Sequence, residues 1–495
     1  MKYFFFIIIL FIQSFYVNDL LGSDPVIQMK IIYNPGDSFR NAIKYHKLSK
    51  YNEAIDFYDN ALKNNPNSTL IYNNRGNCFL KIGKYKKALN DFNKAIELEP
   101  KSEIAYSNIG YLFHTLNQYK RSIKNCDKAI EFNPRYSEAY VTKSVSLNQL
   151  GLYKQAIDAI NTAIKLTPDS PELYFNRGCF FHNLQKFSQA IIDYNKAIKL
   201  NPKYSEAYNN LGSSCSNIPD QRSKALKYYN LAIKHNSKNA EAYINRGVYY
   251  NDVKQYQIAL KNFRTAIKLN PKSAIAYVNI GDSYVGLNKN RIALINYNKA
   301  IKLDPNCSYA YHHIGFYYQN LAQFNKAIKN YNKATKIRPK LFKVFISRGY
   351  CYNSIAEYKH AINDFNKAIH LNSKSDTAYY NRGLSYFSLD NYEQAILDFS
   401  KAIDLGNKVN SNYYNSRGEV YRRIGEYNYA IKDYFETIRI DPKNTYAYYN
   451  LGISYYMINS PYKSVHAFLK GFVYGGNVID AMKSLRKKDI INLTF

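Results

Sequence analysis

The sequence contains no tryptophan and only six cysteines, and none of the cysteines belongs to a C-x-x-C pair. The usual spacing of zinc ligands is therefore missing. Four cysteines, Cys78, Cys179, Cys215 and Cys351, fall inside the first predicted helix of a repeat. We expect packed free thiols rather than a metal site or a disulfide framework.

Acidic residues are also scarce, since 37 Asp and Glu stand against 68 Lys and Arg and give a formal net charge of +31. A positive field of this size attracts nucleic acid, anionic lipid or another acidic polymer. Lys, Asn, Ile and Tyr are, however, the residues that an AT-rich genome favours together, so the lysines also fit a solvated surface. Both interpretations stay open here, although we expect no nucleic-acid partner.

No catalytic constellation is present. The nearest match to a phosphate loop, residues 76–85, has its glycines too far apart, and Tyr85 follows the lysine where Ser or Thr is needed. His312 and His313 are adjacent, so their side chains diverge on a helix. His114 and His182 occupy equivalent positions in different units, where we expect a surface or groove role. We expect no enzyme activity, no metal and no cofactor.

Only one long hydrophobic run is present, at residues 3–12. It is shorter than the roughly 20 residues that span a bilayer, but it suits the apolar region of a signal peptide. Leu20 and Leu21 stand where small residues would precede a cleavage site near Gly22 and Ser23. Residues 1–23 are therefore predicted to be a signal peptide, with a short membrane anchor or a buried segment as alternatives, and residues 24–34 a linker. The prediction is export through the secretory pathway, or membrane attachment through this segment if it is not cleaved.

The remainder of the chain repeats one unit every 34 residues, which overrides the usual estimate of domain number from length. The register is marked by a glycine, which is replaced by Ala42 and Ser144 in two units. The glycines are Gly76, Gly110, Gly178, Gly212, Gly247, Gly281, Gly315, Gly349, Gly383, Gly418 and Gly452. Alanines follow at fixed distances, and proline closes most units. A period of this length is typical of stacked repeats that need no single large core.

Each unit predicts two antiparallel helices. In the unit 174–202, Tyr174, Gly178 and Phe181 share one helical face. A matching stripe on the second helix consists of Phe187, Ala190, Ile191, Tyr194, Ala197 and Ile198. The small residues allow close approach of the helix axes, and Pro202 ends the second helix.

The pattern Tyr174, Gly178, Phe181, Ala190, Tyr194, Ala197 and Pro202 resembles the tetratricopeptide repeat. The resemblance covers residues 35–476. It implies an all-α fold, a right-handed superhelical solenoid of about 13 helix-turn-helix repeats with first helices lining a concave channel. Extra residues at 218–220 and 405–411 predict longer connections. The apolar spacing in residues 477–495 predicts a C-terminal capping helix.

Asparagine recurs two positions before the glycine of the first helix. These candidate peptide-binding residues are Asn74, Asn108, Asn176, Asn210, Asn245, Asn279, Asn381 and Asn450. An amide both donates and accepts, so such a row suits the backbone of an extended peptide. A similar row lines the channel in the repeat region of O-linked N-acetylglucosamine transferases, and the resemblance implies the same use here.

A second row of asparagines argues for the opposite interpretation. It lies in the second helix, where an outer position is expected, at Asn93, Asn195, Asn230, Asn298, Asn332 and Asn366. Duplication of an Asn-rich unit therefore produces such rows without any ligand. The first-helix asparagines could equally satisfy the turns between repeats.

The family's carboxylate clamp requires Lys and Asn at two positions of one first helix. Pairs such as Asn73/Asn77 and Phe175/Cys179 do not match it, which argues against a receptor for chaperone tails. Apolar residues such as Phe175 at these positions instead suggest a channel with apolar anchors. The sequence therefore favours a non-enzymatic interaction scaffold that binds extended segments of protein partners. The alternatives are a basic solenoid that binds an anionic polymer or membrane surface, and the regulatory arm of a separate enzyme subunit.

Overall fold

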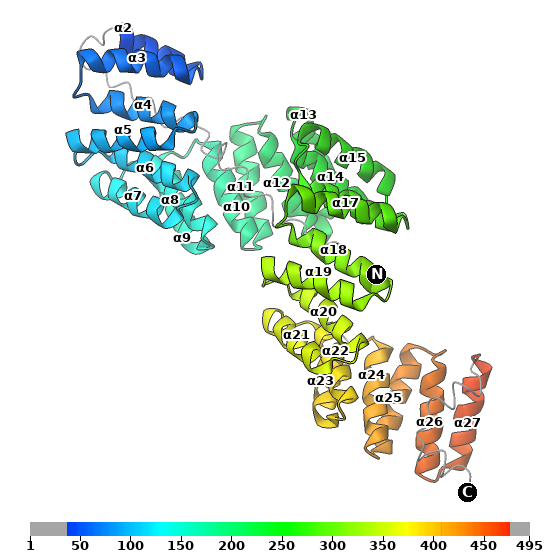
Figure 1. Cartoon of the computed structure of the whole chain (residues 1–495). Coiled ribbons are helices and arrows are strands. Elements are labelled where there is room, and N and C mark those ends of the chain that lie inside the picture. Colours follow the sequence, from blue (N-terminus) through cyan, green and yellow to red (C-terminus); the bar gives the residue numbers. More distant parts are fainter. Residues whose placement is uncertain (1–36, 407, 476–495) are drawn as a thin grey trace. The chain divides into compact units, whose positions relative to one another are not determined.

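The computed structural model describes residues 37–406 and 408–475, and this part of the chain consists of α-helices, one short 3-10 helix and no strand (Figure 1). The helices form thirteen consecutive pairs in these residues. The first helices are α2 (Asp37–Lys47), α4 (Thr69–Lys81), α6 (Glu103–Thr115), α8 (Ser137–Gln149), α10 (Pro171–Asn183), α12 (Ser205–Ser216), α14 (Ala240–Asp252), α16 (Ala274–Gly286), α18 (Ser308–Asn320), α20 (Phe342–Ser354), α22 (Asp376–Ser388), α24 (Ser411–Arg423) and α26 (Thr445–Met457). The second helices are α3 (Tyr51–Asn64), α5 (Tyr85–Leu98), α7 (Tyr119–Phe132), α9 (Tyr153–Leu166), α11 (Phe187–Leu200), α13 (Arg222–His235), α15 (Tyr256–Leu269), α17 (Asn290–Leu303), α19 (Phe324–Ile337), α21 (Tyr358–Leu371), α23 (Tyr392–Leu405), α25 (Tyr427–Ile440) and α27 (Pro461–Val473).

The helix pairs belong to two compact units that divide after Pro271. Within each unit a first helix packs on its own second helix, and the second helix packs on the first helix of the next pair. Neighbouring first helices also touch, as α4 and α6 do, and α20 and α22. Each pair thus buries its apolar faces against its sequence neighbours, which is how stacked repeats are stabilised. The predicted all-α solenoid is confirmed.

The turn inside a pair follows one pattern in every described pair except α12–α13. In the pair α10–α11, Gln185 has a φ of 58°, and the amides of Gln185 and Lys186 donate to the carbonyls of His182 and Phe181 at 2.9 Å. This is the Schellman arrangement that ends a helix through one left-handed residue. Gly151 takes the same place in the turn of α8–α9 with a φ of 75°.

Close approach of the two helices in a pair depends on the register glycine. A Cβ atom on Gly178 would lie 2.7 Å from the ring of Tyr194, which is only 1% exposed. Ala190 and Ala197 flank this ring and are fully buried. The predicted stripe on the second helix is therefore confirmed. Phe175, expected as an apolar anchor in a channel, is instead 4% exposed and packs against the ring of Tyr194 in α11 and that of Tyr204, which directly precedes α12.

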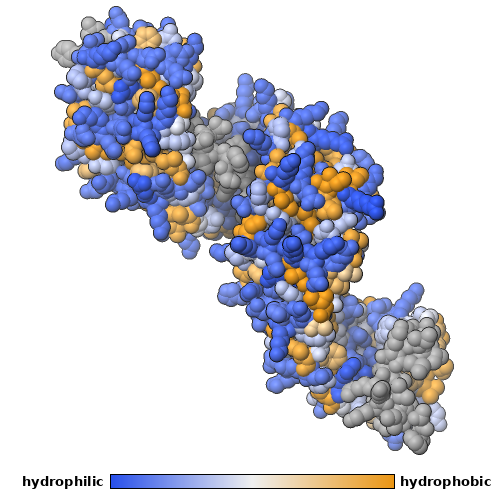
Figure 2. Space-filling view, viewed as in Figure 1, coloured by the Kyte–Doolittle hydropathy of each residue, from blue (hydrophilic) through white to orange (hydrophobic). Residues whose placement is uncertain are grey.

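The two predicted extra residues both lengthen connections. Between α12 and α13 the longer connection contains the 3-10 helix η2 (Pro219–Gln221). Between α23 and α24 the chain includes Lys408 with a φ of 59°. The surface in Figure 2 is mostly hydrophilic, with hydrophobic residues interspersed.

The signal peptide or anchor at residues 1–23, the linker at 24–34 and the capping helix at 477–495 lie outside the described residues, so they stay predictions. No helix in the described ranges is both long enough and apolar enough to cross a bilayer.

Candidate functional site

The eight candidate asparagines occupy the same place on eight first helices, but most of them are buried. Asn74, Asn108, Asn176, Asn245, Asn279 and Asn450 are at most 6% exposed, while Asn210 and Asn381 are half-buried. They lie where one first helix meets the next. The row is therefore part of the interface between neighbouring pairs.

Several members of the row bond other residues of the array. Asn108 donates to Asn73 Oδ1 at 3.3 Å, and Asn245 donates to Asn209 Oδ1 at 3.0 Å. In both cases the acceptor belongs to the preceding first helix. Asn381 instead donates to the carbonyl of Thr377 in its own helix at 2.7 Å. The bonds of Asn108 and Asn245 therefore join neighbouring first helices rather than the turns between repeats.

Three members of the row keep buried polar atoms without a hydrogen bond in the described part of the chain. These atoms are Nδ2 of Asn74, Oδ1 of Asn450 and both Nδ2 and Oδ1 of Asn176. A buried amide group without a partner costs roughly 1–3 kcal/mol. These three side chains therefore hold hydrogen-bonding capacity that the fold itself does not use. Whether the row binds peptide stays a prediction.

A second polar row, near the C-terminal end of the first helices, joins consecutive pairs. His114 Nδ1 lies 2.7 Å from Ser146 Oγ, and His182 Nδ1 lies 2.8 Å from Ser214 Oγ. Asn353 accepts from Ser385 at 2.8 Å in the same register. The predicted groove-surface role of the histidines is wrong for His114, which is 2% exposed, because the next first helix covers this position. Burial lowers the pKa of His114 and of His182 to about 4, so both are neutral at pH 7.

The adjacent histidines of α18 face different neighbours. His313 Nδ1 lies 3.3 Å from Asp282 Oδ1, which also accepts a hydrogen bond from the Tyr297 hydroxyl at 2.7 Å. His312 lies against the ring of Tyr331. Burial raises the pKa of Asp282 to about 7 and lowers that of His313 to about 4. In the described ranges, no cluster of three or more His, Cys, Asp or Glu residues is placed to hold a metal ion.

The most regular polar feature of the structure was not predicted from the sequence. Arg177, directly before the register glycine, donates to both oxygens of Asp193 at 2.8 and 2.7 Å, and its third nitrogen donates to Asn161 at 2.8 Å. Asp193 belongs to the same pair and Asn161 to the preceding second helix. The hydrogen bonds to Asp193 and the negative charge of that carboxylate raise the pKa of Arg177, and the Asp193 side chain is only 4% exposed. One guanidinium group thus joins three helices.

The same link recurs along the array with minor changes. Arginines in this register are Arg75, Arg177, Arg246, Arg348, Arg382 and Arg417, and their partners in their own pairs are Asp91, Asp193, Asn262, Asp364, Asp398 and Asp433. Their acceptors in the preceding pair are Asp59, Asn161, Asn230, Asn332, Asn366 and Ser400. The sequence contains a signal for this link, because an Arg-Gly pair recurs with Asp, or once Asn, sixteen residues after the arginine.

These contacts also assign a role to part of the outer asparagine row. Its members are exposed, as expected for the outer side, and Asn230, Asn332 and Asn366 accept from an arginine of the next pair. Asparagine in this register therefore contributes to the contact between neighbouring pairs. The two asparagine rows differ in that only the first-helix row contains buried, unpaired amides.

Models of repeat families match the chain over much of its length. Two models described as tetratricopeptide repeat match residues 70–102, 171–204, 240–273 and 377–406, and residues 104–136, 137–170, 274–307 and 308–341. A third, described as TPR repeat, matches residues 44–83, 349–390 and 418–459. Together these matches cover more than half of the chain. No curated protein sequence matches it.

Similar solved structures include the APC/C hetero-tetramer Cut9–Hcn1, at 13% identity and a TM-score of 0.48, over 90% of this chain and 95% of that chain. MamA is 30% identical over 34% of this chain and 91% of its own, with a TM-score of 0.32. YrrB, titled a TPR protein with an unusual peptide-binding site, is 25% identical over 37% of this chain and 95% of its own, with a TM-score of 0.31.

The repeat-model matches fall on the same helix pairs that the register glycines, the paired turns and the arginine links define. The chain therefore belongs to the tetratricopeptide repeat family.

Proposed function

We propose that this chain binds extended peptide segments of partner proteins along the face formed by its first helices. The observation that carries the proposal is Asn176, whose buried amide has neither its donor nor its acceptor paired in the described residues. In other first helices, Asn74 keeps an unpaired buried donor and Asn450 an unpaired buried acceptor. A peptide backbone offers a carbonyl and an N–H group at each residue, so it can supply the partners that these amides lack. Because the amide atoms are buried, binding requires the neighbouring first helices to move apart and admit the peptide.

The broader function does not depend on these residues. The tetratricopeptide repeat is an interaction scaffold for protein or peptide partners, and the fold is typically non-enzymatic. Stacked helix pairs present a long continuous surface, which suits an extended ligand.

The experiment compares the full-length chain with a variant that combines Asn74→Ala, Asn176→Ala and Asn450→Ala. Peptides are selected on the unmodified chain from a random dodecapeptide phage library, synthesised, and measured by fluorescence anisotropy. A neutral hydrogen bond contributes about 0.5–1.5 kcal/mol, so three lost partners should weaken binding by about 10-fold to 100-fold.

The matched control carries three asparagine-to-alanine changes on exposed positions of second helices, at Asn195, Asn363 and Asn428. It removes the same number of amides from the other side of the pairs. Equal loss of affinity in both triple variants would remove the basis for the proposal, as would unchanged affinity in the first-helix variant.

A second candidate function, binding of an anionic polymer or membrane surface, is favoured by the net charge of +31. The second-helix lysines that would carry it include Lys196, Lys199, Lys299 and Lys302. Lys196 and Lys299 also cover tyrosine rings of their own pairs, at 5.6 and 4.7 Å from the ring centres, so they serve packing as well. Counterion release predicts that such binding falls steeply with salt, whereas a peptide groove should lose much less.

The proposal also includes export through the secretory pathway, on the basis of the apolar run at residues 3–12. N-terminal sequencing of the mature protein tests it. A mature N-terminus near Ser23 is expected for a signal peptide, and a retained Met1 would indicate an anchor or a buried segment.

A further inference from the structure

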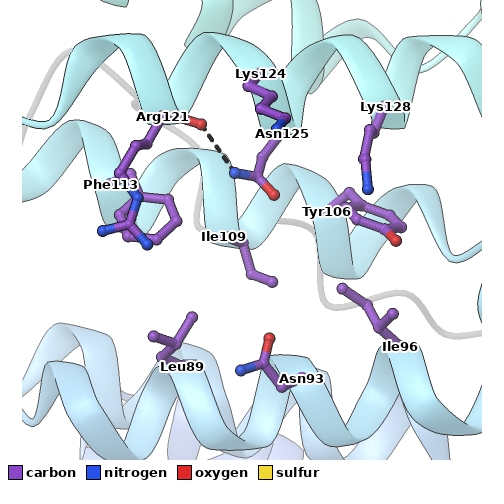
Figure 3. Close-up of a pocket in the computed structure, with 10 residues that line it drawn as sticks. All are labelled: Leu89, Asn93, Ile96, Tyr106, Ile109, Phe113, Arg121, Lys124, Asn125 and Lys128. Atoms are coloured by element: carbon purple, nitrogen blue, oxygen red, sulfur yellow. Dashed lines mark hydrogen bonds between the residues drawn. The ribbon is translucent and has the colours of Figure 1, made fainter.

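A pocket of about 500 Å³ lies on the outer side of the first unit, between α5, α6 and α7 (Figure 3). This volume is within the range of ligand-binding pockets, about 300–1,000 Å³. Its apolar part consists of Leu89 and Ile96 from α5 and Ile109 and Phe113 from α6. We call it the outer pocket.

The outer pocket lies at a position where the arginine link is absent. In the register where Arg177 joins three helices, α6 carries Ile109, directly before Gly110. Asn93 of α5 is the equivalent of Asn161, which accepts the third hydrogen bond of Arg177. Isoleucine is too short to reach across the space that a guanidinium group fills elsewhere, so the space between the helices stays open.

Three cations border the opening. Arg121, Lys124 and Lys128 line the outer pocket from α7, and no Asp or Glu is among its lining residues. The guanidinium carbon of Arg121 lies 3.8 Å from the ring centre of Phe113, and Lys128 Nζ lies 4.9 Å from that of Tyr106. These ring contacts hold two of the cations beside the apolar part of the pocket. The pocket thus combines an apolar cavity with a positive border.

The spacing of the cations fits an extended chain better than one compact anion. Residues 121, 124 and 128 follow each other along one face of α7 and span about 10 Å at a rise of about 1.5 Å per residue. In an extended peptide, side chains on one side repeat every second residue, about 7 Å apart. Residues i, i+2 and i+4 of such a peptide point to the same side, so an apolar side chain at i+2 can enter the cavity while long acidic side chains at i and i+4 bend back toward different cations.

We propose that the outer pocket binds a short acidic segment of a partner protein. An apolar side chain of that segment packs against Leu89, Ile96 and Ile109, and flanking carboxylates pair with Arg121 and Lys124. The amide of Asn93 is available at the pocket wall for the backbone. This surface is separate from the first-helix face that carries the proposed function.

The second unit contains the same set of residues in the same register. Around α17, α18 and α19 the equivalents of Asn93, Ile109, Arg121, Lys124 and Lys128 are Asn298, Ile314, Lys326, Lys329 and Lys333. The local contacts also agree. Asn125 donates to the carbonyl of Arg121 at 2.8 Å and Asn330 to that of Lys326 at 2.9 Å, and Lys333 lies over Tyr311 as Lys128 lies over Tyr106.

The pair α10–α11 shows the alternative. There Arg177 stands in place of Ile109, and Gln189 and Ile192 stand in place of Arg121 and Lys124. The helices α9, α10 and α11 therefore have the arginine link and lack two of the three cations. The residues of this pair can therefore replace those that leave the outer pocket open and two of those that make its border positive.

The test uses two variants of the full-length chain, and each also carries the matching changes in the second unit, which are Ile314→Arg with Asn330→Asp for the first variant and Lys326→Gln with Lys329→Ile for the second. Ile109→Arg with Asn125→Asp, the plug variant, introduces the Arg–Asp pair that other pairs of this chain contain, so it fills the outer pocket. Arg121→Gln with Lys124→Ile, the charge variant, copies the residues of α11 and leaves the cavity open. The charge variant changes exposed side chains, so it tests the proposal even if the plug variant folds poorly.

Peptides selected on the unmodified chain from the dodecapeptide library should include a class with Asp or Glu on both sides of an apolar residue. Their affinity should fall by about 10-fold to 100-fold in each variant, as expected for lost charge-assisted hydrogen bonds and a filled cavity. It should not change when Asn74, Asn176 and Asn450 are replaced, which separates this pocket from the first-helix face.

Absence of an acidic class, or acidic peptides that bind both variants as well as the unmodified chain, would overturn the proposal. Anionic phospholipid vesicles serve as a second probe. If the plug variant loses vesicle binding but not peptide binding, the pocket is assigned to a membrane surface, and this result would also overturn the proposal.

Discussion

Replacing Arg177 by isoleucine should loosen the array locally, because Asp193 would keep its charge in a nearly buried position without its two hydrogen bonds. Removing one partner of a buried ion pair costs about 3–5 kcal/mol. The bond to Asn161 is lost as well, so contact with the preceding pair also weakens. The isoleucine itself is compatible with the fold, since α6 carries Ile109 at this place.

A second change should restore most of the loss. Combining Arg177→Ile with Asp193→Asn copies the combination of Ile109 and Asn125, in which the asparagine donates to the carbonyl four residues earlier in its own helix. The double variant therefore leaves no buried charge, and we expect it to lie within about 1–2 kcal/mol of the unmodified chain. The coupling between the two sites should then be about 2–3 kcal/mol.

The assay should be local, because a repeat array need not unfold in a single step. Hydrogen exchange followed by mass spectrometry reports the opening free energy of α10 and α11 separately from the remainder. The link between Arg417 and Asp433 in the second unit serves as an unaffected reference. A loss below about 1 kcal/mol in Arg177→Ile, or no recovery in the double variant, would refute the role assigned to this link.

Three further outcomes are expected. The pKa of His114 is lowered from its ordinary value of 6.5 to about 4, so the unfolded chain binds more protons than the folded chain between these values, and the free energy of unfolding decreases as the pH is lowered. Between pH 7.5 and 5 this decrease should be about 2 kcal/mol in hydrogen exchange of α6, and it should be absent in His114→Phe. Gly178→Ser should cost about 1–3 kcal/mol in thermal or exchange measurements, because the new atoms meet the buried Tyr194 ring; adding Tyr194→Ile, which copies the Ser and Ile of the preceding pair, should recover part of it, and no loss in the single variant would contradict the packing. Removal of residues 477–495 should accelerate exchange in α27, whose Leu469 is 58% exposed among other apolar residues, if that segment caps the array as predicted; unchanged exchange would argue against the cap.

The helix pairs could be predicted from the sequence because their determinants lie within one unit. Gly178 and Tyr194 are sixteen residues apart, and their size complementarity is visible in the repeated pattern. The turn at Gln185 follows equally from local geometry. Periodicity and short-range packing were therefore sufficient for the number, type and order of helices.

The sequence predicted which residues form the candidate site, but not which of them are buried or what they contact. The row that includes Asn176 was identified correctly as one position on the first helix, yet its burial depends on the neighbouring first helix. His114 was assigned to a surface for the same reason, although Ser146 of the next pair covers it. The apolar residue Phe175 was expected in a channel and belongs to the core.

The sequence by itself thus determined the repeat, its two helices and the residues that bring them together, since these are properties of one 34-residue unit. Only the tertiary structure decided which asparagines are paired and which keep a buried amide unpaired. It also decided that Arg177 joins two neighbouring pairs, and that Ile109 in the same register leaves an open pocket. The physical reason is that these contacts form between side chains of successive pairs, and their distance and burial depend on how one pair stacks on the next.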